Sequence, residues 1–303
     1  MSQIKVFVIS LKGSDRINLI RRRLKNLKIK YEIFYGINGK DIKNHSKLLK
    51  YYDSIKTEKY IGRKLSFPEI AASLSHLNIY KLIIKKGISS AIIVEDDAYP
   101  SNILAKWIKK KIRIDNYTIL SFYCYPSGFL NSIGKKTPMP GVNIHNSITH
   151  INNSSCYQIN LKTCKKIIRL TKGKVCGVGD WPFNFKKDKI FLSTTIPYLN
   201  IIDDHFVSNT AIEREKTLKV NNYSNFLRKF FFSNLIKNLF NLLMITYLFK
   251  SKMNFSFYRE QFFEKSYIYF KSFFNNKYIS TYKVFKNTNY YPSDLKMHRF
   301  FKK

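Results

Sequence analysis

Three consecutive carboxylates, Glu95-Asp96-Asp97, are the residues of this chain whose type and spacing point most directly to chemistry. They follow residues 91–94 (AIIV), a run typical of a strand buried on both faces of a sheet. Adjacent carboxylates repel one another, so after a buried strand they need a divalent cation or a Lys or Arg to neutralise them. Mg²⁺ or Mn²⁺ would meet this need with oxygen ligands and could hold a phosphorylated substrate. The alternative is a solvated acidic loop that caps the next helix.

Glu69 and His76 are candidate catalytic residues because they lie seven positions apart. This is about two turns of a helix, so both would face the same side and could project into one crevice. Two alternatives stay open. Glu69 is the third residue after Ser66 and can complete a helix capping box, and His76 can be a buried imidazole with satisfied hydrogen bonds.

The elements that would position these residues form an α/β pattern. Residues 4–11 predict a buried strand, residues 31–37 a second one, and apolar side chains recur at helical spacing between them from 17 to 27. Ser14 is the expected cap of this helix. A strand, helix, strand order of this kind opens an α/β sheet.

Ser10, Leu11 and Arg16 lie at the end of the first predicted strand. Open α/β sheets bind ligands beyond the carboxyl ends of their strands, so we expect these residues to meet a nucleotide there. The guanidinium of Arg16 could contact phosphate.

Downstream, residues 38–65 are expected to be irregular, and a helix is expected from Ser66 to about residue 86, before Gly87. The remaining predictions are strands over 117–122 and 156–159, a helix over 162–170, and two strands within 191–202 that are separated at Pro197.

The chain has 303 residues, with 54 Lys and Arg against 19 Asp and Glu, a formal net charge of +35. This charge favours anionic partners such as nucleic acid, anionic lipid or a phosphorylated glycan, although codon composition rich in A and T could also produce it. Beyond residue 216 the composition shifts to aromatics, Asn and Lys, which predicts a domain over 1–216 and a helical, basic and aromatic extension over 217–303.

Residues 238–249, the longest charge-free stretch of the extension, are fewer than the roughly 20 apolar residues of a membrane-spanning helix. A helix lying on an anionic membrane is favoured by apolar residues that can share one side and by basic residues near them; packing within the core is the alternative. The apolar residues are Phe230, Phe231, Leu235, Leu239, Leu242 and Leu243, and the basic ones are Arg228, Lys229 and Lys237. The four cysteines form no CxxC pair, so we expect reduced thiols. The start of the chain lacks a small-residue cleavage site, so we expect no signal peptide.

The sequence resembles glycosyltransferase family 25, the lipooligosaccharide galactosyltransferase family. The motifs that carry the resemblance are 69–76 (EIAASLSH), 91–97 (AIIVEDD), 6–11 (VFVISL) with 15–16 (DR), and 36–39 (GING). The resemblance covers residues 4–210. Two departures bear on the donor sugar: Ala71-Ala72 stands where the family usually has Gly-Cys, and 154–157 (SSCY) lacks the usual Gly before the Tyr.

The resemblance implies a GT-A-like, Rossmann-type mixed sheet flanked by helices, a UDP-sugar donor, usually UDP-galactose, inversion to a β linkage, and a lipooligosaccharide acceptor. An inverting transfer needs one base for the acceptor hydroxyl while a metal ion holds the leaving group. Asp180, in the segment 177–182 (GVGDWP), is the first candidate for this base, unless it stabilises a turn. By analogy with GT-A enzymes, His205 would join Asp97 and Glu95 as metal ligands, unless the run 203–205 is an exposed turn.

The leading hypothesis is therefore a metal-dependent galactosyltransferase attached to the cytoplasmic face of the bacterial inner membrane. Its lipid-linked, phosphorylated acceptor would suit a basic protein. A nucleic-acid-binding protein is the second hypothesis, but the sequence shows no zinc-ligand spacing, RNP-like motif or basic zipper, so no nucleic acid is expected. A metal-dependent hydrolase that uses the same three acids is the third, and a UDP-sugar should not stabilise it.

Overall fold

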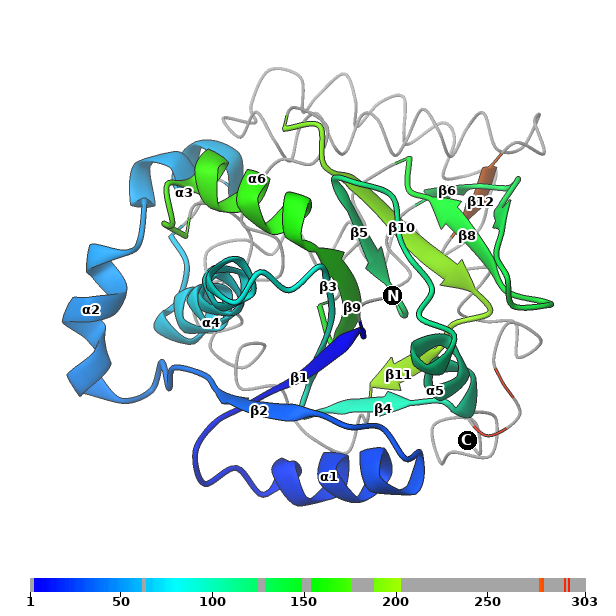
Figure 1. The fold of residues 1–303 in the computed structure, drawn as a ribbon. Coiled ribbons are helices and arrows are strands. Elements are labelled where there is room, and N and C mark those ends of the chain that lie inside the picture. The colour runs from blue at the N-terminus through cyan, green and yellow to red at the C-terminus, as the bar shows by residue number, and fades with distance from the viewer. Residues whose placement is uncertain are drawn as a thin grey trace, which may run out of the picture.

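The computed structural model describes residues 3–61, 64–124, 129–148, 154–175 and 188–202, the short strand Tyr278–Ser280, and residues 292 and 294. Within these residues lies an eight-stranded mixed sheet with the strand order β2-β1-β3-β9-β5-β10-β8-β7 (Figure 1). The expected mixed α/β sheet flanked by helices is confirmed.

The strands that carry the site lie in one half of the sheet. β1 (Lys5–Ser10) pairs in parallel with β2 (Glu32–Tyr35) on one side and with β3 (Ser90–Glu95) on the other. β9 (Cys156–Asn160) lies antiparallel between β3 and β5 (Thr118–Ser121). The other strands are β4 (Ala98–Pro100), β6 (Phe129–Asn131), β7 (Lys135–Lys136), β8 (Asn143–Asn146), β10 (Phe191–Ile196), β11 (Asn200–Ile202) and β12 (Tyr278–Ser280).

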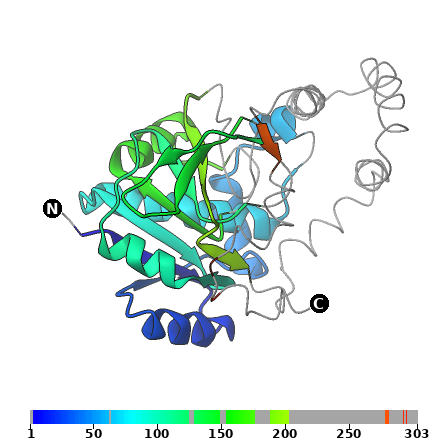
Figure 2. The same ribbon diagram turned by 90° about the vertical axis from the view of Figure 1, so that its right-hand side faces the viewer.

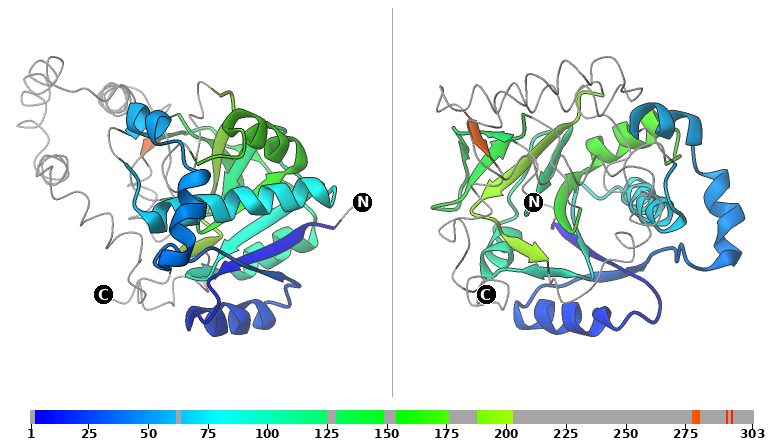
Figure 3. Two further views of the ribbon diagram at one scale, coloured as in Figure 1. Left: turned by 90° about the vertical axis from the view of Figure 1, so that its left-hand side faces the viewer. Right: turned by 180° about the vertical axis from the view of Figure 1, so that it is seen from behind.

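The helices cover both faces of the sheet, as the side views show (Figures 2 and 3). They are α1 (Arg16–Asn26), α2 (His45–Lys50), α3 (Ser54–Ile61), α4 (Phe67–Lys85), α5 (Asn102–Lys109) and α6 (Leu161–Thr171), with a 3₁₀ turn over Ile42–Asn44. Two buried clusters result, because successive side chains of a strand point to opposite faces. Phe7 and Ile93 pack in the cluster that contains residues of α4 and α6, whereas Val8 and Ile92 pack in the cluster that contains residues of α1 and α5.

The expectation of irregular structure over 38–65 is wrong, because this segment contains α2, α3 and the 3₁₀ turn. Each of these helices has eight residues or fewer, and α2 buries only Leu48. Such short elements produce no repeated apolar pattern in the sequence, and their contacts with the core stabilise them instead.

The start of α4 is as expected: Ser66 and Glu69 form a capping box, and Pro68 lies in the first turn. The two strands separated at Pro197 are confirmed as β10 and β11, and the Ile196–Pro197 peptide bond is cis. The three cysteines within the described residues, Cys124, Cys156 and Cys164, are free and buried, as expected of reduced thiols; Cys176 lies outside them.

The predicted domain boundary at 216 and the stretch 238–249 both lie outside the described residues. Two described parts of the 217–303 extension contact the first domain. β12 pairs antiparallel with β6, and the Asp294 carboxylate accepts hydrogen bonds from Arg23 Nη2 at 2.7 Å and from the Asn102 backbone N–H at 2.9 Å. In the part of the chain that the structure describes, no helix combines the length and apolar character needed to cross a membrane.

Candidate active site

The three acids lie at the carboxyl end of β3, directly beside the carboxyl end of β1. The parallel register pairs Ile9 with Glu95, so the next residue of β1, Ser10, is brought alongside Asp96. α1 then begins at Arg16, within reach of the same carboxylates. This edge of the sheet is the place where open α/β folds bind ligands.

Asp96 is held by two hydroxyl groups and a guanidinium. Its Oδ2 accepts hydrogen bonds from Ser10 Oγ at 2.8 Å and from Ser14 Oγ at 2.9 Å, and its Oδ1 lies 3.7 Å from Arg16 Nη1. Burial raises the pKa of Asp96, although the two hydroxyl groups and Arg16 oppose this effect. These bonds fix the direction in which the carboxylate points.

Ser14 has a different role from the expected one. The N-cap of α1 is Asp15, without a side-chain capping bond, and the Ser14 hydroxyl binds Asp96, which lies 82 positions later in the chain. Ser10 is only 2% exposed and its hydroxyl also donates to Asp96, so it orients that carboxylate; its contact with a nucleotide stays a prediction. The backbone oxygen of Leu11 accepts the Ser14 N–H bond and the side chain is half-buried; its nucleotide contact stays a prediction.

Asp97 has fewer stabilising contacts than Glu95 and Asp96 among the described residues. Its Oδ2 lies 3.8 Å from Arg16 Nη1, and its Oδ1 is buried with no hydrogen-bond partner among the described residues. Burial, together with the negative charges of Glu95 and Asp96, raises the pKa of Asp97 to about 8. Without a bound metal ion, the Asp97 carboxyl therefore keeps its proton near neutral pH.

Glu95 shows the opposite behaviour. Its Oε1 accepts hydrogen bonds from Ser154 Oγ at 2.6 Å and from His76 Nε2 at 3.2 Å, and its side chain remains 30% exposed. Burial alone would raise the pKa of Glu95, but His76, Ser154 and Arg16 together lower it. Two carboxyl groups two positions apart thus have pKa values displaced in opposite directions, as is common at catalytic sites.

A buried chain of hydrogen bonds stands behind Glu95. His76 Nδ1 lies 2.7 Å from the Tyr157 hydroxyl, which lies 2.7 Å from the Tyr80 hydroxyl. An ionised Glu95 can only accept, so His76 Nε2 carries the hydrogen of their shared bond. With a neutral ring, the order of donors is Tyr80 to Tyr157 to His76 to Glu95.

His76 therefore corresponds to the alternative left open by the sequence, a buried imidazole with satisfied hydrogen bonds. It is 2% exposed, and both of its ring nitrogens are engaged. This makes it a positioning residue for Glu95. Tyr80 and Tyr157 were not among the residues predicted from the sequence, although Tyr80 lies four residues after His76 and so shares its face of α4.

Glu69 forms the helix capping box that was the alternative to a catalytic role. Its Oε2 accepts hydrogen bonds from the Ser66 backbone N–H at 3.0 Å and from Ser66 Oγ at 3.2 Å, which completes the capping box, and the residue is fully buried. A catalytic role for Glu69 stays a prediction. Asp180 and His205 lie outside the described residues, so their roles as base and metal ligand also stay predictions.

The charges of this cluster fit a divalent cation. When ionised, the three carboxylates carry −3, and Arg16, the cation near Asp96 and Asp97, reduces the sum to −2. Asp97 Oδ1, a buried oxygen that lacks a partner among the described residues, is a ready ligand for such an ion. Among the described residues, no group of three or more His, Cys, Asp or Glu side chains is arranged so that it could hold a metal ion, so further ligands would be needed.

The fold and this cluster define an α/β protein with an acidic cluster at the carboxyl ends of β1 and β3. The chain belongs to glycosyltransferase family 25, described as an LPS biosynthesis protein family, whose profile matches residues 3–178. The resemblance inferred from the motifs is thereby confirmed.

Two curated relatives are procollagen galactosyltransferases. Procollagen galactosyltransferase 1 of Danio rerio is 32% identical over 100 residues, which cover 31% of this chain and 16% of that protein. Procollagen galactosyltransferase 1-A of Xenopus laevis is 33% identical over 104 residues, covering 32% and 16%. The matched segment thus spans 16% of the length of each relative. Among solved structures, mannose-1-phosphate geranyltransferase from Thermus thermophilus is similar with a TM-score of 0.32 and 8% identity, covering 56% of this chain and 60% of that one.

Proposed function

We propose that this protein is an inverting, metal-dependent glycosyltransferase that moves galactose from UDP-galactose to a glycan acceptor in a β linkage. Family membership supports the transfer of a sugar, and the names of both curated relatives support galactose. The observation that carries the assignment of the site is Asp97, because its buried oxygen lacks a partner among the described residues and lies in a cluster whose charge is −2 when all three acids are ionised.

The residues of the cluster have separate tasks in this proposal. Asp97 and Asp96 would hold Mn²⁺ or Mg²⁺, which when bound would supply positive charge for the leaving UDP. Ser10 and Ser14 keep Asp96 oriented. Arg16 lies beside both aspartates, where its guanidinium can bind a phosphate oxygen of the donor.

Glu95 borders the same site with a fixed orientation. Ser154 and His76 bind one of its oxygens, so the side chain points in one direction and stays ionised. An ionised, oriented carboxylate can accept hydrogen bonds from the hydroxyl groups of a sugar. We retain Asp180 as the proposed base for the acceptor hydroxyl, and Glu95 and His205 as proposed metal ligands.

For the acceptor we propose a lipooligosaccharide or a related lipid-linked surface glycan. The description of the family as LPS biosynthesis proteins supports this choice, and the charge of +35 suits a phosphorylated acceptor. The curated relatives are named for procollagen instead. We place the enzyme at the cytoplasmic face of the inner membrane, with the 217–303 extension as a membrane contact.

The test is the release of UDP from UDP-galactose, UDP-glucose and UDP-N-acetylhexosamines, with Mn²⁺ or with EDTA. Wild type is compared with Asp97→Asn, which keeps the shape and removes the charge, and with Asp115→Asn, whose carboxylate is 73% exposed and pairs with Lys135. We expect Mn²⁺-dependent release from UDP-galactose that is lost only in Asp97→Asn. If no donor gave UDP release or thermal protection, the proposal would be contradicted. That result would favour the hydrolase or the nucleic-acid-binding hypothesis.

A further inference from the structure

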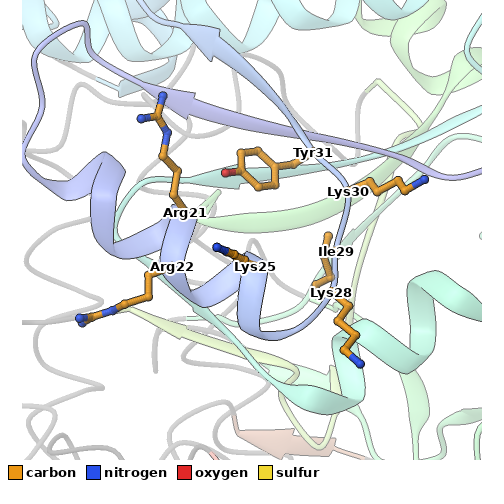
Figure 4. A pocket seen from close by; sticks show the side chains of 7 residues that line it. All are labelled: Arg21, Arg22, Lys25, Lys28, Ile29, Lys30 and Tyr31. Atoms are coloured by element: carbon orange, nitrogen blue, oxygen red, sulfur yellow. The ribbon is translucent and has the colours of Figure 1, made fainter.

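A second charged region lies at the other end of α1 from the acids. It surrounds a cavity of about 590 Å³ whose basic lining residues come from α1 and from the segment that connects α1 to β2 (Figure 4). These residues, here called the α1 basic cluster, are Arg21, Arg22, Lys25, Lys28 and Lys30. Ile29, which is buried, and Tyr31, which is half-buried, complete the lining.

The side chains of the α1 basic cluster are all exposed, and none forms an ion pair with any residue that the structure describes. Two other arginines of α1 behave differently. Arg16 faces Asp96 and Asp97, while Arg23 binds Asp294 and the Pro100 carbonyl and stacks on Tyr99 at 4.2 Å. Some cations of α1 therefore contact other parts of the protein, whereas Arg21, Arg22 and Lys25 are exposed to solvent.

Neither of two simpler explanations accounts for this group. Cations at the carboxyl end of a helix offset its dipole, but only Arg23 and Lys25 lie in the last turn of α1. Codon composition rich in A and T favours Lys, yet two of the five residues of the cluster, Arg21 and Arg22, are among the eleven arginines of the chain. Five exposed positive charges on one part of the surface attract an anionic ligand.

Arginine and lysine clusters are suited to phosphate, because the guanidinium fork matches its oxygens and lysine adds point charge. The cluster lies apart from the acids, which hold the donor in the proposed function. Arg16 touches the acids, and Lys25 lies nine residues further along α1, about 14 Å at the rise of an α-helix. The cluster also precedes β2, whereas the acids follow β3.

We propose that the α1 basic cluster is a docking face that binds the phosphate groups of anionic membrane lipids. Groups of four to eight Lys or Arg on a surface helix bind anionic headgroups, and a neighbouring Tyr suits the boundary between headgroups and water. This face belongs to the first domain, so it binds membrane independently of the 217–303 extension. It depends neither on the donor sugar nor on a metal ion.

The test uses the full chain and vesicles of phosphatidylcholine with or without phosphatidylglycerol. The variant Arg21→Gln/Arg22→Gln/Lys25→Gln removes three charges from the cluster. The control Lys162→Gln/Lys165→Gln/Arg169→Gln removes three exposed charges from α6, a helix of the same length. At about fivefold per charge, we expect about a hundredfold weaker binding of the first variant to phosphatidylglycerol vesicles, and a small change in the control.

Circular dichroism and UDP release from soluble UDP-galactose accompany the binding assay. Both should stay at the wild-type level in the α1 variant, which separates a failure of docking from a failure of the proposed reaction. Equal losses in the two triple variants would overturn the proposal, because they would mean general charge attraction. It would also be overturned if vesicle binding were unchanged while binding of inorganic phosphate or of single-stranded RNA fell in the α1 variant.

Discussion

Replacing Asp97 by Asn should make the metal-free protein more stable while it abolishes metal-dependent activity. In wild type, folding places this carboxyl beside Glu95 and Asp96, in a buried position with one oxygen that lacks a partner among the described residues. The pKa of Asp97 rises from 3.8 to about 8 in consequence. The Asn amide has nearly the same shape and carries no charge, so it avoids this repulsion.

The size of the effect follows from linkage. Above pH 4 the unfolded chain has lost the Asp97 proton and the folded chain has kept it, so wild-type stability falls as pH rises from about 4 to 8. At about 1.4 kcal/mol per pKa unit, the cost at pH 7 is at most about 4 kcal/mol. Because neighbouring groups and water relax around a coupled carboxyl, we expect about half of this, about 2 kcal/mol, as the gain in Asp97→Asn.

The assay is urea unfolding in EDTA at pH 5 and at pH 8, with Asp115→Asn as the control. The advantage of Asp97→Asn over wild type should be larger at pH 8, and the control should match wild type at both pH values. Excess Mn²⁺ should stabilise wild type more than Asp97→Asn, because the ion replaces the proton. A variant that is less stable than wild type, or whose advantage does not change with pH, would refute this account of Asp97.

Three other substitutions test buried residues of α4 and β9 near the acids. Tyr157→Phe removes the hydroxyl between Tyr80 and His76, so it should lower the free energy of unfolding by about 1–3 kcal/mol and change kcat more than KM. Urea unfolding and steady-state kinetics measure these two effects. Tyr80→Phe, at the far end of this series of hydrogen bonds, should have the smaller effect on kcat. Glu69→Gln should cost about 1 kcal/mol through its capping box with Ser66 and leave UDP release nearly unchanged. Full stability with lost activity in Glu69→Gln would instead restore its catalytic role.

Several features of the fold could be predicted because their signals are local. The start of α4 follows from Ser66 and Glu69, three positions apart, and the buried strand β3 follows from four consecutive apolar residues. The place of the acids at a strand's carboxyl end follows from the same run. Helices α2 and α3 could not be predicted, because each is too short to show a periodic pattern.

The sequence by itself determined the α/β class, the family and the position of the acids after β3, because each depends on residues that are neighbours in the chain. Only the tertiary structure decided what each acid does. The partners of Asp96 and Glu95, Ser14 and Ser154, lie 82 and 59 positions away from them. The opposite pKa shifts of Glu95 and Asp97 depend on burial and on those partners, so they arise only when β1, β3, β9 and α4 pack together.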